Sequence, residues 1–205
     1  MPVRRRRLIA LALAGVLASA AVACSRTDGR TLPPADPDRT TTTPSAPVIQ
    51  PPTGDLGAFT LRSTAFEDGA SIPERLTCTA DAPVSPDLSW TGTPLDAASL
   101  AIVARDRDAG GFVHWIVTEI DPFVQGIGEG GIPENAVEGQ NGASGLGWLA
   151  PCPPAGGGTH TYELVLLALP SPPDVPDGAT SEQAAALLEA SAGQRAVLTG
   201  TVTAG

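Results

Sequence analysis

The chain has 205 residues, 42% of them hydrophobic, which is enough for one globular domain with a buried core and appended segments. Acidic residues outnumber basic ones by 22 to 12, and the formal net charge is −10. Because so acidic a chain has no basic stripe to neutralise the phosphates of a duplex, we expect no nucleic-acid partner.

The first 23 residues are predicted to be a secretory signal peptide. Four arginines, Arg4 to Arg7, precede an apolar run from Leu8 to Ala23. The run has sixteen residues, fewer than the roughly 20 that a helix needs to cross a bilayer, which favours an export signal over a membrane-spanning helix. The residues after the arginines do not clearly follow a twin-arginine pattern, so the export route stays open.

Cys24 is the predicted site of lipidation. Ala21-Val22-Ala23-Cys24 resembles a lipobox, in which the cysteine is lipidated and becomes the mature N-terminus, although Ala21 stands where Leu is usual. The same residues also satisfy an A-x-A cleavage site for simple secretion. We therefore expect a protein of the cell envelope, lipid-anchored to the membrane on its extracytoplasmic side, with a secreted protein as the alternative.

Residues 24–55 are predicted to form a disordered tether that leads to one folded domain over 56–205. The tether is rich in proline and contains four consecutive threonines, Thr40 to Thr43, but few apolar residues. Such a composition buries too little apolar surface to offset the entropy of ordering the chain.

The domain is predicted to be mainly β. Six segments rich in apolar and β-branched residues are bounded by Pro, Gly or Asp, which is the signature of strands. They are 59–63, 88–90, 99–105, 113–120, 160–169 and 196–203. The runs 100–103 and 164–169 are almost continuously apolar, which is typical of strands covered on both faces. We therefore expect a mostly antiparallel sandwich or closed β structure.

One helix is predicted, over 181–192. Thr180 is its expected N-cap, Gln183 completes a capping box, and Gly193 is the expected stop.

A long irregular stretch runs from Pro122 to Gly158 and contains many Gly and Pro residues. Because a compact domain seldom has so long an irregular connection without a purpose, we expect it to contribute to binding.

Five polar side chains stand at the ends of predicted strands. Asp106 and Asp108 are two residues apart directly after 99–105, so their carboxylates share a face if the extended conformation continues. His114 lies at the start of the next strand, and His160 and Tyr162 share a face at the start of another. Singly, such residues are more often ordinary turn or surface residues. Together they are candidates for a site if the fold brings them into contact.

A series of short motifs gives the domain a family resemblance. In chain order they are Asp87-Leu88-Ser89-Trp90, Leu100 to Val103, Asp106-Arg107-Asp108-Ala109, Val113-His114-Trp115, Asn141-Gly142, Ala150-Pro151-Cys152-Pro153-Pro154 and His160-Thr161-Tyr162. By their number and order, over nearly all of 56–203, they resemble the bacterial branch of the phosphatidylethanolamine-binding, or Raf kinase inhibitor-like, proteins.

The resemblance implies an antiparallel β-sandwich with one or two short peripheral helices and a small anion pocket. Carried over position by position, the pocket residues are Asp106, Asp108, His114, Ala150, Pro151, His160 and Tyr162. Imidazole and phenol groups can donate to phosphate oxygens, loop amides add neutral donors, and an Asp can hold an imidazole by its other nitrogen. We expect an anion such as phosphate or phosphorylethanolamine, and no cofactor.

Three features depart from the family's pattern. The family's D-P-D-A-P turn is here Asp106-Arg107-Asp108-Ala109-Gly110, which lacks two stiffening prolines and adds a cation near the rim of the pocket. Ala150 stands where a glycine usually precedes the P-C-P-P run, and Thr161 replaces a basic residue. The selectivity of the pocket is therefore expected to differ.

Cys78 and Cys152 remain as a pair if Cys24 is lipidated. In an oxidising compartment an even pair favours a disulfide, which we prefer to the alternative of two buried free thiols.

Other chemistries find weaker patterns in the sequence. A zinc site from His114, His160 and Asp106 or Cys152 lacks the spacing of zinc motifs. There is no G-x-S-x-G elbow, no activating helix terminus at Cys152, and no opposed pair of carboxylates. We predict non-catalytic binding. The alternatives are an inhibitor or modulator of a kinase or protease, and a hydrolase that uses the His114, His160 and Asp106 cluster.

Overall fold

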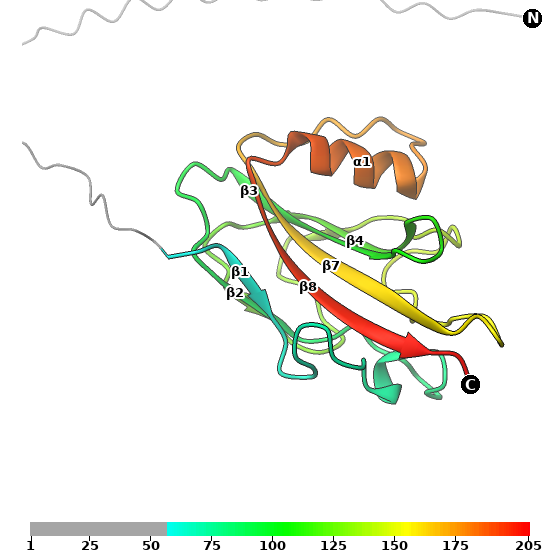
Figure 1. Ribbon diagram of the computed structural model, residues 1–205. Helices are drawn as coiled ribbons and strands as arrows, with labels where there is room; N and C mark the ends of the chain where they lie inside the picture. The colour runs from blue at the N-terminus through cyan, green and yellow to red at the C-terminus, as the bar shows by residue number, and fades with distance from the viewer. Residues whose placement is uncertain (1–56) are drawn as a thin grey trace, which may run out of the picture. The chain divides into compact units, whose positions relative to one another are not determined.

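The computed structural model describes residues 57–205, which form two β-sheets, one α-helix and a short 3-10 helix (Figure 1). The predicted signal peptide 1–23, Cys24 and the predicted tether 24–55 lie outside the described residues. Within 57–205, no helix is both long enough and apolar enough to cross a bilayer.

The two sheets are antiparallel, as predicted. The smaller has the strand order β1-β2-β5, with bounds Thr60–Arg62, Leu88–Thr91 and Gly126–Ile127. The larger has the order β6-β4-β3-β7-β8, with bounds Val137–Glu138, Phe112–Ile120, Ser99–Asp106, Thr159–Leu169 and Gln194–Thr203. The helices are η1, Glu74–Leu76, and α1, Ser181–Ser191. The two-residue strands β5 and β6 are the ones the sequence did not predict.

The larger sheet has a hydrophobic layer on each face. Toward the smaller sheet, alternate residues of β3 and β7 such as Leu100 and Leu166 pack with Trp90 of β2 and Trp115 of β4. On the other face, the intervening residues pack under α1, where Leu188 is fully buried. β3 and β7 are therefore covered on both faces, which confirms the prediction from their continuous apolar runs. Figure 1 shows α1 lying across this sheet.

The start of α1 follows the sequence prediction, but its end does not. The Thr180 hydroxyl accepts from the Gln183 amide at 3.3 Å, and the Gln183 side chain accepts from the Thr180 amide at 3.0 Å, which completes the capping box. The last helical residue is Ser191, one residue before the predicted end, and the C-cap is the extended Ala192 and not a left-handed glycine. Gly193 instead donates to the Ala168 carbonyl at 2.9 Å, so it begins the pairing of β8 with β7.

The N-cap offers a simple test of this local structure. We expect Thr180→Ala to lower the free energy of unfolding by about 1 kcal/mol, because the Gln183 amide loses its acceptor. Urea denaturation measures the change, and Thr180→Ser, which keeps the hydroxyl, is the matched control. Equal destabilisation by the two variants would mean that the hydroxyl does not cap the helix.

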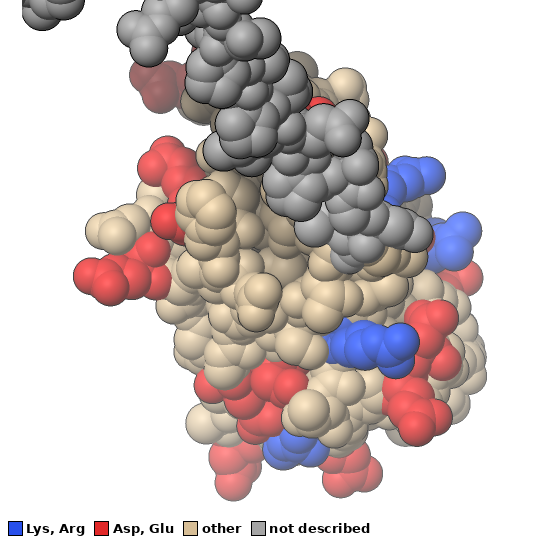
Figure 2. All heavy atoms as spheres, turned by 90° about the vertical axis from the view of Figure 1, so that its left-hand side faces the viewer, with Lys and Arg blue, Asp and Glu red and all other residues tan. Residues whose placement is uncertain are grey.

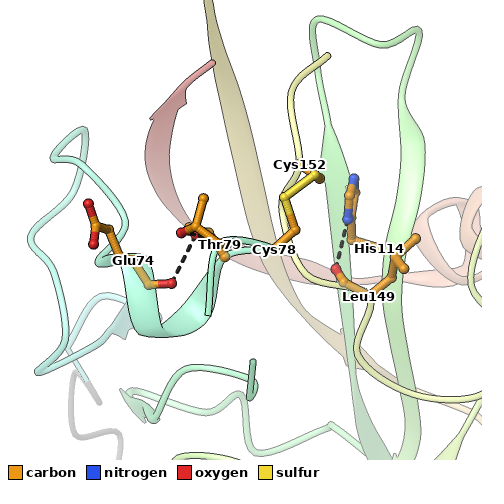
Figure 3. Close-up of a disulfide and its surroundings, with 7 residues drawn as sticks. Glu74, Cys78, Thr79, His114, Leu149 and Cys152 are labelled. Atoms are coloured by element: carbon orange, nitrogen blue, oxygen red, sulfur yellow. Dashed lines mark hydrogen bonds between the residues drawn. A yellow bond between two sulfur atoms is a disulfide. The ribbon is translucent and has the colours of Figure 1, made fainter. Parts of the chain in front are cut away.

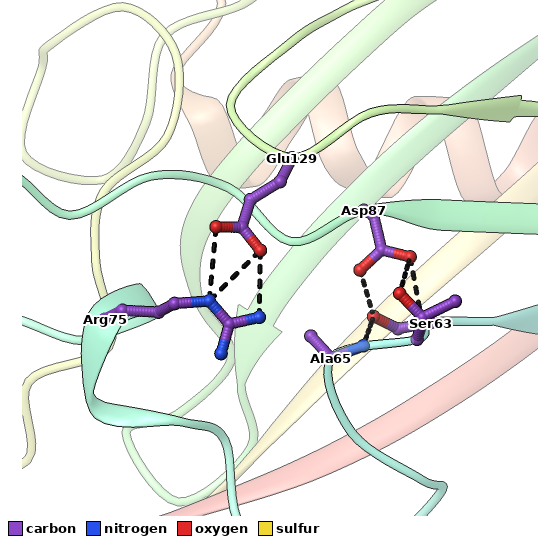
Figure 4. Close-up of polar contacts among 6 residues, drawn as sticks. Ser63, Ala65, Arg75, Asp87 and Glu129 are labelled. Carbon is purple, nitrogen blue, oxygen red and sulfur yellow. Dashed lines mark hydrogen bonds and ion pairs between the residues drawn. The ribbon is translucent and has the colours of Figure 1, made fainter.

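Asp87, the first residue of the D-L-S-W motif, has a structural role. Its carboxylate accepts from the Ser63 hydroxyl at 3.0 Å and from the Thr64 amide and hydroxyl at 2.9 and 2.8 Å (Figure 4). These bonds fasten the chain that leaves β1 to the start of β2. Arg75 and Glu129, also drawn in Figure 4, form a separate exposed ion pair at 2.9 Å.

Charged side chains are scattered over the described surface that Figure 2 shows. Acidic groups predominate along the left and lower edges of the view, and the basic groups are separate from one another, with no continuous basic patch on that face. The expectation of no nucleic-acid partner rests on this distribution and on the net charge, and it stays a prediction.

Candidate functional site

The strand register brings three strand ends together. In the larger sheet, Asp106 at the end of β3 pairs with Phe112 at the start of β4 and with Tyr162 near the start of β7. Asp106 follows Ala104 by two residues, and Ala104 and Tyr162 both belong to the layer between the sheets. Asp106 and Tyr162 therefore face the interior of the sandwich at one end.

Asp106 and His160 form a buried pair. Asp106 is 3% exposed as a residue, and its Oδ2 accepts from His160 Nδ1 at 2.7 Å. Its Oδ1 accepts from the amides of Asp108 and Ala109 at 2.9 and 3.1 Å. Burial opposes ionisation, but the bonds from His160 and Asp108 outweigh it, and the pKa of Asp106 lies below its usual value. Because this bond uses Nδ1 of His160, the other ring nitrogen, Nε2, stays available for a ligand.

His114 is held by the backbone of the irregular stretch. Its Nδ1 donates to the Leu149 carbonyl at 2.8 Å, and the Leu149 amide donates to the His114 carbonyl at 2.9 Å (Figure 3). Because a carbonyl can only accept, Nδ1 carries a proton and Nε2 is left for a ligand. Burial lowers the pKa of His114, and the Leu149 carbonyl and the Asp106 charge offset this only in part.

Tyr162 packs against His114, and its hydroxyl makes no well-aligned hydrogen bond to the described residues. Its ring meets the His114 ring edge to face, with centroids 5.2 Å apart. The hydroxyl is buried and has no hydrogen-bond partner among the described residues, although the Asp106 carboxylate and the Cys152 amide lie close enough to influence its pKa. Burial, followed by the Asp106 charge, raises the pKa of Tyr162. The group is thus a neutral donor that makes no well-aligned hydrogen bond, even to the neighbouring Asp106 carboxylate.

A disulfide lies at the rim of this cluster. Cys78 and Cys152 are bonded, with their Cα atoms 5.3 Å apart, and both residues are exposed. Beside the bridge, the Cys78 amide donates to the Pro151 carbonyl at 3.0 Å. Figure 3 shows the bridge next to His114 and Leu149. The structure thus contains the bridge that the sequence analysis preferred to two free thiols.

Comparison with known families agrees with the motif order. The family model for phosphatidylethanolamine-binding protein matches residues 62–203. The chain belongs to this family.

Two kinds of relative extend the comparison. The "Putative lipoprotein LppC" of Mycobacterium tuberculosis is 41% identical over 179 residues, which cover 85% of this chain and 84% of the relative. A phosphatidylethanolamine-binding protein homologue of Chlamydia trachomatis superposes with a TM-score of 0.62 at 33% identity, covering 71% of this chain and 97% of its own. Escherichia coli YbcL has a TM-score of 0.64 at 24% identity, covering 70% and 96%, and supports the fold alone.

Four of the seven residues expected from the family pattern form one contact network, namely Asp106, His114, His160 and Tyr162. Ala150 and Pro151 are buried beside it, in the segment between Leu149 and the bridged Cys152. The network contains both histidines of the chain.

Asp108 is placed differently from the prediction. The extended conformation ends at Asp106, so the two carboxylates do not share a face. Asp108 is exposed in the following turn, and its Oδ2 accepts from the Thr161 amide at 2.6 Å. This bond fastens the turn to β7, which is a positioning role. Arg107, the cation that distinguishes the turn from the family pattern, is also exposed.

The Asn141-Gly142 motif stabilises a loop that packs against the Phe112 ring, next to His114. Asn141 is buried, its amide group donates to the Gly147 carbonyl, and its oxygen accepts from the Ala143 and Gly145 amides. A Cβ on Gly142 would lie 2.5 Å from an atom of the Phe112 ring, and that ring packs edge to face against His114. Only glycine fits there without displacing Phe112.

A large hollow in the described part of the chain lies elsewhere. It has a volume of about 1190 Å³ and is bordered by the end of β4, the loop after it and the start of α1. None of the seven residues lines it, and its charged lining residues are acidic: Glu119, Asp121, Glu134 and Asp177. Four carboxylates repel an anion, so this hollow does not fit the expected ligand.

The rival chemistries gain no support at the site. Among residues 57–205, no three His, Cys, Asp or Glu side chains are grouped so as to hold a metal ion. The Cys152 sulfur is bonded to Cys78, so it is no free nucleophile in this state. No hydrogen bond of the described residues joins either histidine to a Ser, Thr or Cys side chain.

Proposed function

We propose that this family member is an exported, lipid-anchored binding protein that holds a phosphate-sized anion at the Asp106, His114, His160 and Tyr162 cluster and does no chemistry on it. The buried Tyr162 hydroxyl carries the proposal, since it makes no well-aligned hydrogen bond to the described residues and its ring packs against the His114 imidazole. A buried polar group of this kind is costly unless a ligand or water satisfies it. An anion oxygen is a suitable acceptor.

The charges of the cluster are compatible with an anion. Asp106 is the one carboxylate inside it, and three donors already surround that group: His160 Nδ1 and the amides of Asp108 and Ala109. The Nε2 atoms of both rings stay unused by the described residues and become donors when the rings are protonated. With the Tyr162 hydroxyl they make three donors for one tetrahedral anion.

The absence of chemistry rests on the lack of a nucleophile. An Asp–His pair resembles a general base, but a hydrolase of the covalent type also needs a hydroxyl or thiolate within reach of the imidazole. Cys152 is bridged, and the hydrogen bonds of both imidazoles go to other groups. A hydrolase that activates water remains the outcome against which the proposal is tested.

The lipid anchor is supported by a relative. The match to the mycobacterial lipoprotein covers 85% of this chain, a larger share than residues 57–205 alone can supply. It therefore extends into the region before residue 57. The relative is named a lipoprotein, which agrees with the resemblance of Ala21-Val22-Ala23-Cys24 to a lipobox. Labelling with a radioactive fatty acid should mark the wild-type protein and not Cys24→Ala; labelling of neither would indicate plain secretion.

Calorimetry tests the anion site. The mature chain with Cys24→Ser is titrated with phosphate and with phosphorylethanolamine. We expect saturable binding that His160→Ala weakens by at least tenfold, because one charge-assisted bond contributes about 1.5–3 kcal/mol. Glu163→Ala, three residues along β7, is the matched control and should bind like the wild type.

Two outcomes would contradict the proposal. Absence of binding by the wild-type protein would remove the anion site and direct the search to protein partners. Turnover of p-nitrophenyl phosphate that is lost in His160→Ala and His114→Ala would favour the hydrolase instead.

A further inference from the structure

The disulfide joins two exposed segments at the mouth of the proposed site. Cys78 follows η1, and Cys152 belongs to the proline-rich segment 150–154. Both cysteines are exposed, while Ala150 and Pro151 directly before Cys152 are buried beside the anion cluster. The bridge therefore lies at the protein surface, beside the buried residues that border the proposed site (Figure 3).

Residues 149–152, which the bridge holds, position His114 and Tyr162, two of the side chains proposed to bind the anion. The Leu149 carbonyl accepts the Nδ1 proton of His114 at 2.8 Å, which fixes the ring and leaves Nε2 toward the site. Three residues later, the Cys152 amide lies next to the Tyr162 hydroxyl and affects its pKa. A shift of residues 149–152 would thus change the environment of His114 and Tyr162 at once.

Few other bonds hold this segment. Pro151, Pro153 and Pro154 have no backbone N–H, so the segment cannot pair as a strand. Two backbone bonds anchor it on either side: the Leu149 amide to His114, and the Cys78 amide to the Pro151 carbonyl at 3.0 Å. The second of these itself depends on Cys78 staying in place. The disulfide therefore holds this segment in place, as backbone hydrogen bonds hold a strand in a sheet.

We infer that the Cys78–Cys152 bond positions the 149–152 segment against His114 and Tyr162, so that the anion affinity of the site depends on the redox state of this pair. The inference rests on the proposed anion site. Reduction by dithiothreitol transfers two electrons and two protons to the bridge, breaks the S–S bond, leaves two thiols and closes the reagent into its cyclic disulfide. Both sulfurs belong to exposed residues, which gives the reductant access.

The test compares oxidised, reduced and bridge-free protein. Phosphate is titrated into the mature chain with Cys24→Ser before and after dithiothreitol, and into the same chain with Cys78→Ser and Cys152→Ser. We expect phosphate to bind about tenfold more weakly to the reduced protein and to the double variant than to the oxidised protein, because residues 149–152 must then become ordered on binding. Reoxidation should restore the affinity of the reduced protein but not that of the double variant.

Two controls separate positioning from general destabilisation. Leu188→Ala removes a fully buried side chain of α1, which packs on the far face of the larger sheet, and should lower stability without changing phosphate affinity. The His114 ring resonances should shift or broaden on reduction and stay unchanged in Leu188→Ala. All titrations are repeated in trimethylamine N-oxide, which favours the folded state, so that unfolding is not mistaken for loss of the site.

The outcomes are distinguishable. If the oxidised protein does not bind phosphate, the proposed function fails. If oxidised and reduced protein bind equally and the His114 resonances do not move, the anion site stands and the positioning role of the disulfide is overturned.

Discussion

Asp106→Ala is expected to be the most destabilising single change at the site, lowering the free energy of unfolding by about 3 kcal/mol, because it leaves buried donors without an acceptor. The carboxylate accepts from His160 Nδ1 and from the amides of Asp108 and Ala109. Asp106 and His160 are 3% and 9% exposed, so water cannot replace the lost bonds fully. Chemical denaturation measures the loss.

Asp106→Asn removes the charge of the Asp106 side chain but keeps its shape, so it measures the contribution of the charge alone. The amide oxygen can still accept from the Asp108 and Ala109 amides, so we expect a smaller loss of about 1 kcal/mol near neutral pH. Since the folded-state pKa of Asp106 is lowered, its ionic contribution is complete above the unfolded value of 3.8 and is lost as the pH falls through the folded value. The wild type and Asp106→Asn should therefore converge in stability below about pH 4. A difference that is independent of pH would mean that the Asp106 charge contributes nothing.

The sequence predicted the parts of the fold that have a strong periodic signal. The apolar runs in β3 and β7 are long, and they lie at the centre of the larger sheet, where both faces are covered. The capping box of α1 is a local motif that needs no tertiary context. By contrast, β5 and β6 have two residues each, and strands so short exist only because neighbouring strands offer pairing partners.

The side chains of the candidate site could be predicted from the sequence, but the backbone groups that contact them could not. Asp106, His114, His160 and Tyr162 were found because these residue types are chemically distinctive at strand ends. The Leu149 carbonyl that holds His114 has no such signature, because every residue carries a carbonyl. The outward position of Asp108 follows from the turn, in which Gly110 and Gly111 have φ of 67° and 82° and reverse the chain directly after β3.

Sulfate affinity is expected to rise as the pH falls below neutrality, by up to about tenfold per pH unit. Burial lowers the pKa of His114 below 6.5, and its single proton lies on Nδ1, bonded to the Leu149 carbonyl. The neutral ring thus offers a lone pair at Nε2, which repels a sulfate oxygen. Binding must be accompanied by protonation of Nε2, and sulfate keeps its charge over this range, so the slope reports on the protein. It should level off below the folded-state pKa of His114.

His114→Gln tests the origin of this slope. Glutamine cannot take up the proton, so calorimetric titrations of the variant should show a much flatter dependence of sulfate affinity on pH, while Asp106 and His160 keep their bond. An unchanged slope in the variant would assign the proton uptake to another group.

Phosphate should behave differently from sulfate because the hydrogen phosphate ion carries an O–H group. This group can donate to the neutral Nε2 of His114, which sulfate cannot do. At neutral pH the site should therefore prefer phosphate, and the preference should shrink as acid protonates His114 and makes Nε2 a donor to either anion. Tyr162 does not contribute to this preference, because its raised pKa keeps the hydroxyl neutral and it donates to both anions throughout. A preference for phosphate that does not change with pH would mean that His114 does not contact the anion, and that Tyr162 and His160 alone define the site.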